Sequence, residues 1–189
     1  MEQGHVYSRE VEKKYIVGGV LGNIPDLAAV IRRNLSVVGE VPLQESRDFF
    51  WEVPNADFLR LRENSRELTV KVTDKGDIVD RIEENVLVDW DSMVAARKLA
   101  TLLFGEPSAV LTKRFIVFHV NLYNQISYKH HTPAIVCLYE VLEDPKYRIF
   151  LEVEAHDVNT VDRTVADLST ALVLTQEMSS LYQIFKGAK

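Results

Sequence analysis

Three short stretches of charged residues in this chain alternate at the two-residue period of a β-strand. The first is Glu10-Val11-Glu12-Lys13-Lys14, and the last is Glu152-Val153-Glu154. The middle stretch comprises Arg60-Leu61-Arg62, Lys71 and Arg81-Ile82-Glu83. Because successive strand side chains point to opposite faces, each run places its charges together on one face of a strand.

The other face of these strands is apolar, with Val11, Tyr15 and Val17 in the first run and Leu151 and Val153 in the last. A two-faced strand normally buries its apolar face and leaves its charged face in contact with water. Charged faces of mixed sign recur here in several strands, which indicates that they line a common space.

The remaining pattern predicts a sheet-rich chain with three helices. We expect strands at residues 6–17, 48–53, 58–63, 67–73, 78–88, 109–121, 124–130, 134–142 and 147–156. Capping residues and the spacing of apolar residues predict helices after Asn23, from Asp89 or Asp91 to Phe104, and over residues 160–186. Without a repeat or a linker, this order predicts a single α+β domain over residues 1–189. Its architecture would be an antiparallel barrel or strongly curved sheet with helices outside.

Four basic residues, Lys14, Arg60, Arg62 and Lys71, are expected on the charged faces. Four cations directed into one dry barrel would repel one another, so we expect them to bind a polyanion. A chain of phosphates is suitable, because arginine matches phosphate oxygens in pairs and lysine supplies a point charge.

The carboxylates of the charged runs need a different partner. Clustered oxygen ligands without cysteine or histidine suit a hard divalent cation, Mg²⁺ or Mn²⁺. We therefore expect metal ligands among Glu10, Glu12, Glu83, Glu152 and Glu154. Cations on one side, metal-binding carboxylates on the other and a phosphate chain between them form the general layout of phosphoryl-transfer sites.

The ordered set of motifs resembles the CYTH superfamily, also called the triphosphate tunnel metalloenzymes. The resemblance spans about residues 6–156 and rests on the E-x-E-x-K run at 10–14, Asp48-Phe49-Phe50-Trp51, Phe58-Leu59-Arg60-Leu61-Arg62, Leu68-Thr69-Val70-Lys71, Arg81-x-Glu83, Lys113-Arg114 and Phe150-Leu151-Glu152-Val153-Glu154. Two positions depart from the family pattern. Thr112 replaces the lysine of the usual Lys-x-Arg pair if Arg114 is its arginine, and Tyr139-Glu140 replaces an Asp-Glu pair.

The resemblance implies an eight-stranded antiparallel β-barrel, a tunnel that binds triphosphate. The residues implied in phosphate binding are Lys14, Arg60, Arg62, Lys71, Arg81, Lys113 and Arg114, with Arg114 preferred over Lys113. Metal binding is expected at Glu10, Glu12, Glu83, Glu152 and Glu154. Glu83 would support the metal or orient water, and Glu83 and Lys71 are the expected catalytic residues.

Three functions remain open for such a site. Our preferred interpretation is divalent-metal-dependent hydrolysis of inorganic triphosphate, thiamine triphosphate or a nucleoside triphosphate. The first alternative is a class IV-type adenylyl cyclase that makes cyclic AMP from ATP. The second is a non-catalytic module that binds triphosphate or polyphosphate.

Charge and composition limit the partners of the chain. The net charge of −6 argues against general binding to nucleic acid or to an anionic membrane. The single cysteine, Cys137, excludes an intramolecular disulfide and a cysteine-based metal site. The first residues do not resemble a secretory signal and no apolar stretch approaches membrane-spanning length, so we expect a cytoplasmic monomer or homodimer with a small-molecule triphosphate as its partner.

Overall fold

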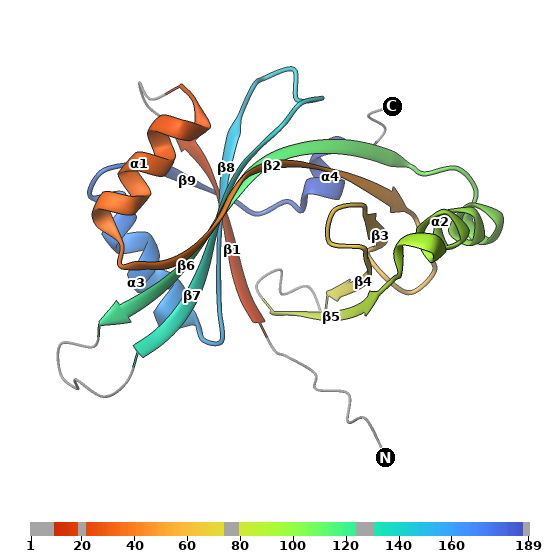
Figure 1. Cartoon of the computed structure of the whole chain (residues 1–189), viewed down its shortest axis with the longest axis horizontal. Coiled ribbons are helices and arrows are strands. Elements are labelled where there is room, and N and C mark those ends of the chain that lie inside the picture. The colour runs from red at the N-terminus through yellow and green to blue at the C-terminus, as the bar shows by residue number, and fades with distance from the viewer. Residues whose placement is uncertain (1–9, 19–21, 74–79, 124–130, 187–189) are drawn as a thin grey trace, which may run out of the picture.

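The computed structural model describes residues 10–18, 22–73, 80–123 and 131–186. Within these residues, nine strands form one antiparallel sheet, accompanied by four helices (Figure 1). The strands are β1 (Glu10–Gly18), β2 (Val37–Trp51), β3 (Phe58–Arg62), β4 (Glu67–Thr73), β5 (Asp80–Leu87), β6 (Ala109–Tyr123), β7 (His131–Val141), β8 (Ile149–Ala155) and β9 (Val173–Glu177). The helices are α1 (Ile24–Asn34), α2 (Trp90–Phe104), α3 (Val158–Ser169) and α4 (Leu181–Phe185).

Eight of the strands follow one another in a ring, in the order β5-β4-β3-β2-β6-β7-β8-β1. The ring is joined where β1 pairs with β5, at Glu10 opposite Arg81 and Val11 opposite Asp80. Further along the same edge of β1, β9 takes the place of β5 as the neighbouring strand. The predicted fold, an α+β chain with an eight-stranded antiparallel barrel, is therefore confirmed, and a ninth strand is added where β5 and β1 separate.

The apolar faces predicted for β1 and β8 lie on the outside of the barrel. Tyr15 on β1 and Leu151 and Val153 on β8 are buried in one cluster with Ile31 of α1 and Leu168 of α3. Figure 1 shows both helices on this side of the sheet. Full burial of such a side chain stabilises the fold by about 1.5–3 kcal/mol. Because this part of the core lies between the sheet and the helices, the inner face of these strands can carry polar residues.

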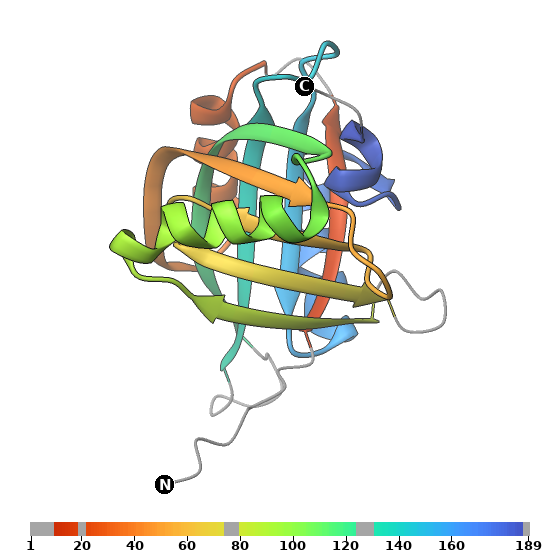
Figure 2. The same ribbon diagram turned by 90° about the vertical axis from the view of Figure 1, so that its right-hand side faces the viewer.

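Helix α2 crosses the outer face of β2 and β3 (Figure 2). Met93 and Ala100 of α2 are buried there against Phe49 of β2 and Leu61 of β3. Among the described residues, no helix combines the length and the apolar character needed to cross a bilayer.

The predicted C-terminal helix over residues 160–186 is wrong. Helix α3 ends at Ser169, β9 follows from Val173, and the short helix α4 begins after its cap Ser180. Helical spacing of apolar residues continues only as far as Leu172, after which the β-branched residues of Val173-Leu174-Thr175 favour a strand along the edge of β1.

The predicted strand that differs most in extent from the structure is the one at 48–53, while most of the others agree within about two residues. The strand predicted at 48–53 is the last part of the longer β2, which begins at Val37. The strand predicted at 124–130, and the part of the first predicted strand before Glu10, lie outside the described residues.

Candidate functional site

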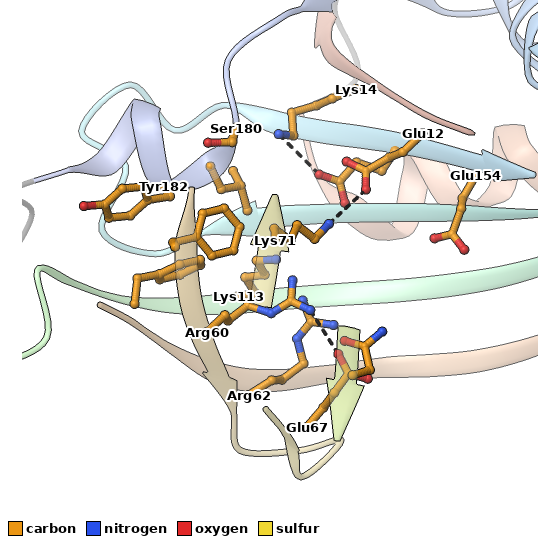
Figure 3. A pocket seen from close by; sticks show the side chains of 15 residues that line it. Glu12, Lys14, Arg60, Arg62, Glu67, Lys71, Lys113, Glu154, Ser180 and Tyr182 are labelled. Atoms are coloured by element: carbon orange, nitrogen blue, oxygen red, sulfur yellow. Dashed lines mark hydrogen bonds and ion pairs between the residues drawn. The ribbon is translucent and has the colours of Figure 1, made fainter. Parts of the chain in front are cut away.

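The charged strand faces meet in one cavity of about 300 Å³ inside the barrel (Figure 3). The cavity is lined by Glu12, Lys14, Phe50, Phe58, Arg60, Arg62, Glu67, Lys71, Asn85, Lys113, Glu152, Glu154, Ser180, Leu181 and Tyr182. Side chains from β1, β2, β3, β4, β5, β6 and β8 thus share one space with the first turn of α4. The common space indicated by the sequence exists, and most of its lining is charged or polar.

Eight of the predicted site residues line this cavity: Glu12, Lys14, Arg60, Arg62, Lys71, Lys113, Glu152 and Glu154. The side chains of Glu10, Arg81 and Glu83 lie outside the described part of the structure. Their backbone positions are described, and they pair Glu83 with Lys71 and Arg81 with Glu10 across neighbouring strands.

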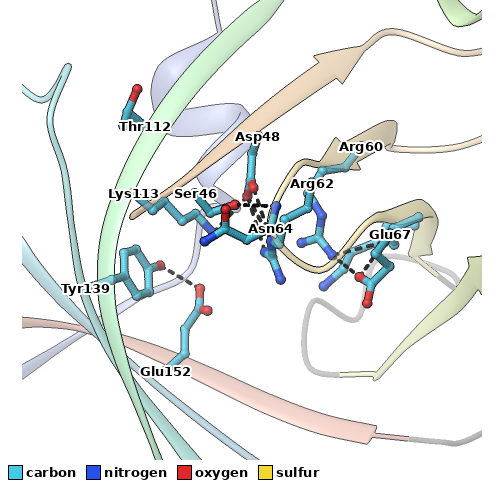
Figure 4. Close-up of polar contacts among 12 residues, drawn as sticks. Ser46, Asp48, Arg60, Arg62, Asn64, Glu67, Thr112, Lys113, Tyr139 and Glu152 are labelled. Atoms are coloured by element: carbon cyan, nitrogen blue, oxygen red, sulfur yellow. Dashed lines mark hydrogen bonds and ion pairs between the residues drawn. The ribbon is translucent and has the colours of Figure 1, made fainter. Parts of the chain in front are cut away.

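The preference for Arg114 over Lys113 is wrong. Lys113 is 7% exposed and faces the cavity from β6. Arg114 lies on the outer face of the same strand, where its guanidinium is 3.1 Å from both Glu45 and Glu140. Thr112 lies apart from the polar cluster in Figure 4. Since alternate residues of a strand share a face, Lys113 is directed inward while its two neighbours are directed outward.

A buried carboxylate that we did not assign to the site lies among the cations (Figure 4). Asp48 on β2 has no exposed surface; its Oδ1 accepts a hydrogen bond from Arg62 Nε at 3.1 Å, and its Oδ2 lies 3.3 Å from Lys113 Nζ. Burial alone would raise the pKa of Asp48, but the charges of Lys113, Arg62 and Arg60 outweigh this and keep the pKa well below its ordinary value. Asp48 is therefore an anion that fixes two cavity cations in place.

Tyr139 on β7 connects Lys113 to the carboxylate side of the cavity. Its hydroxyl donates a hydrogen bond of 2.6 Å to Glu152, and Lys113 Nζ lies 5.0 Å from the centre of its ring. Burial raises the pKa of Tyr139 and the charge of Glu152 raises it further, so the hydroxyl stays protonated. Burial also lowers the pKa of Lys113, an effect that the nearby charge of Asp48 opposes.

The cavity cations have carboxylate partners inside the barrel. The pairs are Lys14 with Glu152 at 3.5 Å, Lys71 with Glu12 at 3.5 Å, Arg60 with Glu67 at 3.0 Å, and Asp48 with Arg62 and Lys113. The argument that mutual repulsion makes a polyanion necessary is therefore wrong. The two lysine pairs are longer than the roughly 2.7–2.9 Å of a strong charge-assisted bond, so an incoming anion can compete for these lysines.

Two glutamates face each other across β1 and β8. Glu12 and Glu154 are directly paired residues, and both line the cavity. Like charges directly opposite one another on a sheet are unfavourable, and a divalent cation beside them would remove that cost. Their oxygen donors suit Mg²⁺ or Mn²⁺. Among the side chains that the structure describes, which exclude those of Glu10 and Glu83, no three His, Cys, Asp or Glu residues group as a metal site.

The C-terminal segment contributes a wall of the cavity that the sequence analysis missed. Tyr182 of α4 stacks on Phe50 with 5.9 Å between ring centres, and its ring lies 5.6 Å from that of Phe58. Lys14 Nζ donates a hydrogen bond of 3.1 Å to the carbonyl oxygen of Ser179. The capping box formed by Ser180 and Gln183 is the sequence signal that could have located the start of α4.

Solved structures with the same fold come from archaea and bacteria. A conserved hypothetical protein from Pyrococcus furiosus matches with a TM-score of 0.60 and 18% identity, over 91% of this chain and 97% of that one. A protein from Bacillus halodurans that is named as a candidate adenylate cyclase matches with a TM-score of 0.55 and 16% identity, over 93% of this chain and 96% of its own. A second protein named as a candidate adenylate cyclase, from Vibrio parahaemolyticus, matches with a TM-score of 0.56 and 15% identity, over 95% of this chain and 98% of its own.

No protein-family model matches the sequence, and no curated protein does. The structural matches nevertheless cover nearly the whole of each chain. The chain therefore shares the fold of these structures, and the fold that the motif resemblance implies, an antiparallel barrel with helices outside, is confirmed.

Proposed function

We propose that this chain is a Mg²⁺- or Mn²⁺-dependent enzyme that hydrolyses a triphosphate inside the barrel. The observation that supports this most is the convergence of five cations from four strands on one cavity of about 300 Å³. These cations are Lys14, Arg60, Arg62, Lys71 and Lys113. The same cavity contains three glutamates of the predicted metal set, Glu12, Glu152 and Glu154.

Binding would exchange one set of ion pairs for another. Phosphate oxygens would take the place of Glu152 and Glu12 as partners of Lys14 and Lys71, whose present distances are 3.5 Å. The glutamates released in this way would be available to the metal ion, with Glu154 beside them. Triphosphate and metal are therefore expected to bind together, since each neutralises the charges that the other leaves uncompensated.

Hydrolysis would require little covalent chemistry from the side chains. A water oxygen forms a bond to the terminal phosphorus while the bond from that phosphorus to the bridging oxygen breaks. One water proton passes to a carboxylate of the cavity, and orthophosphate and the shortened phosphate chain are released. A bound metal ion supplies polarisation of the phosphoryl oxygens and alignment of the attacking water. The cations, among them Lys71 at 3.5 Å from Glu12, would stabilise the charge that develops on the leaving phosphate.

Neighbouring residues on β6 provide a matched test of the phosphate-binding assignment. Lys113→Met removes a cavity cation at similar side-chain length, and we expect triphosphate affinity to fall at least tenfold, because a charged hydrogen bond contributes about 1.5–3 kcal/mol. Arg114→Met, on the outer face, should bind as the wild type does. Titration calorimetry with triphosphate and Mg²⁺ measures both, and equal affinities in the two variants would remove Lys113 from the site.

An adenylyl cyclase is the second candidate, because two of the structures that share this fold carry that candidate name. In a cyclase the 3′-hydroxyl of ATP attacks the α-phosphorus and diphosphate leaves, with the same cations holding the phosphates. The purified chain should be incubated with Mg²⁺ or Mn²⁺ and separately with triphosphate, thiamine triphosphate and ATP. Orthophosphate release supports the hydrolase, and cyclic AMP with diphosphate supports the cyclase. Tight binding without turnover would contradict both and support the binding module.

A further inference from the structure

A buried tyrosine and a cavity lysine meet at the same carboxylate oxygen. Oε1 of Glu152 accepts the hydrogen bond of 2.6 Å from the Tyr139 hydroxyl, and the same oxygen lies 3.5 Å from Lys14 Nζ (Figure 4). The first distance is that of a strong bond to a charged oxygen, whereas the second exceeds the roughly 2.7–2.9 Å of a close ammonium–carboxylate bond. The oxygen that could pair closely with Lys14 is therefore held by the tyrosine.

The position of Tyr139 is itself fixed by packing. Its side chain is 1% exposed, and its ring stacks on Phe150 with 5.4 Å between ring centres and 17° between planes. Tyr139 is not among the residues that line the cavity. Its hydroxyl can thus orient Glu152 without contacting an anion bound in the cavity.

Lys14 has only a loose hold on Glu152, although the two residues are directly paired across β1 and β8. Side chains in such a pair are close enough for a short ion pair. Lys14 Nζ instead donates its shorter hydrogen bond, of 3.1 Å, to the carbonyl oxygen of Ser179. That oxygen is neutral, and a charged phosphate oxygen is a stronger acceptor for an ammonium group.

We propose that Tyr139 is a positioning residue that holds Glu152 away from Lys14 and so keeps Lys14 available for phosphate. The inference rests on the proposed function only in that the anion is a triphosphate. Without the hydroxyl, the Glu152 carboxylate, whose side chain is 20% exposed, would lose its shortest hydrogen bond and close on the lysine that it already faces. A triphosphate would then have to break a tighter ion pair to reach Lys14, so its affinity would fall.

The Tyr139→Phe variant tests this role, because it removes the hydroxyl and keeps the ring that packs on Phe150. Titration calorimetry with a non-hydrolysable triphosphate analogue and Mg²⁺ should show affinity about tenfold below that of the wild type. In a crystal structure of the variant, the distance from Lys14 to Glu152 should shorten from 3.5 Å to about 2.8 Å. The matched control is Tyr15→Phe, at a buried tyrosine on the outer face of β1, which should bind as the wild type does.

A double-mutant cycle separates positioning from a general structural effect. In the Glu152→Gln background no carboxylate charge acts on Lys14, so adding Tyr139→Phe should change the affinity less than twofold. A tyrosine that only supports the fold would lower the affinity in both backgrounds. Equal affinities of wild type and Tyr139→Phe, or a tenfold loss that persists with Glu152→Gln, would overturn this inference and leave the proposed function intact. A wild type that does not bind the analogue would overturn both.

Discussion

Replacing Glu12 and Glu154 together by glutamine is expected to lower metal-dependent triphosphate hydrolysis by a factor on the order of 10³ while the chain remains folded. The two carboxylates are directly paired across β1 and β8 and both line the cavity. Glutamine keeps their shape but removes both charges, so the metal would lose its main protein ligands. Phosphate release at saturating Mg²⁺ or Mn²⁺ is the measurement.

The matched control for this variant is Glu84→Gln, an exposed carboxylate on β5 that does not line the cavity. It should retain full activity. Since Glu12→Gln also removes a carboxylate partner of the buried Lys71, the melting temperature should fall, and circular dichroism should show that the fold is kept. A fully active double variant would contradict the metal assignment, even if its affinity for triphosphate changed.

Substituting Asp48 by asparagine is expected to lower the free energy of unfolding by about 3–5 kcal/mol, because it leaves buried cations without their shared anion. Asp48 has no exposed surface and contacts both Arg62 and Lys113. Triphosphate with Mg²⁺ can supply the missing negative charge. The ligand should therefore raise the melting temperature of the variant more than that of the wild type, and thermal melts with and without ligand measure both effects.

The pH dependence of stability follows from the same contact. The folded-state pKa of Asp48 is below its ordinary value, so its contribution is complete above the unfolded pKa of about 3.9 and is lost as the pH falls through the folded value. In the Asp48→Asn variant, the free energy of unfolding should lack this loss at acid pH. Identical melting temperatures and acid profiles for the two proteins would show that Asp48 does not anchor the cations.

The inner faces of the barrel strands were predictable because strand alternation is local. Once Glu12, Lys14, Arg60 and Arg62 are placed on strands, the two-residue period fixes which of them share a face. The same rule could not choose between Lys113 and Arg114, because β6 carries apolar residues on both faces, with Leu111 and Phe115 in one cluster and Ile116 and Phe118 in the other.

The contacts that the sequence missed depend on strand pairing and on the closed shape of the barrel. Asp48 joins the site because β2 pairs with β3 at Arg62, and no local pattern specifies that register. β9 forms along the stretch of the β1 edge from Lys14 to Gly18, which β5 does not cover among the described residues. The polyanion argument failed because it counted only the cations, whereas Glu12, Glu67 and Glu152 compensate them from other strands.

A crystal structure with Mn²⁺ and a non-hydrolysable triphosphate analogue tests the central claim most directly. We predict analogue density inside the barrel, in contact with Lys14, Arg62 and Lys113, and an anomalous manganese peak beside Glu12 and Glu154. Analogue bound on the outer surface, or manganese far from these two glutamates while the cavity keeps its internal ion pairs, would contradict the account.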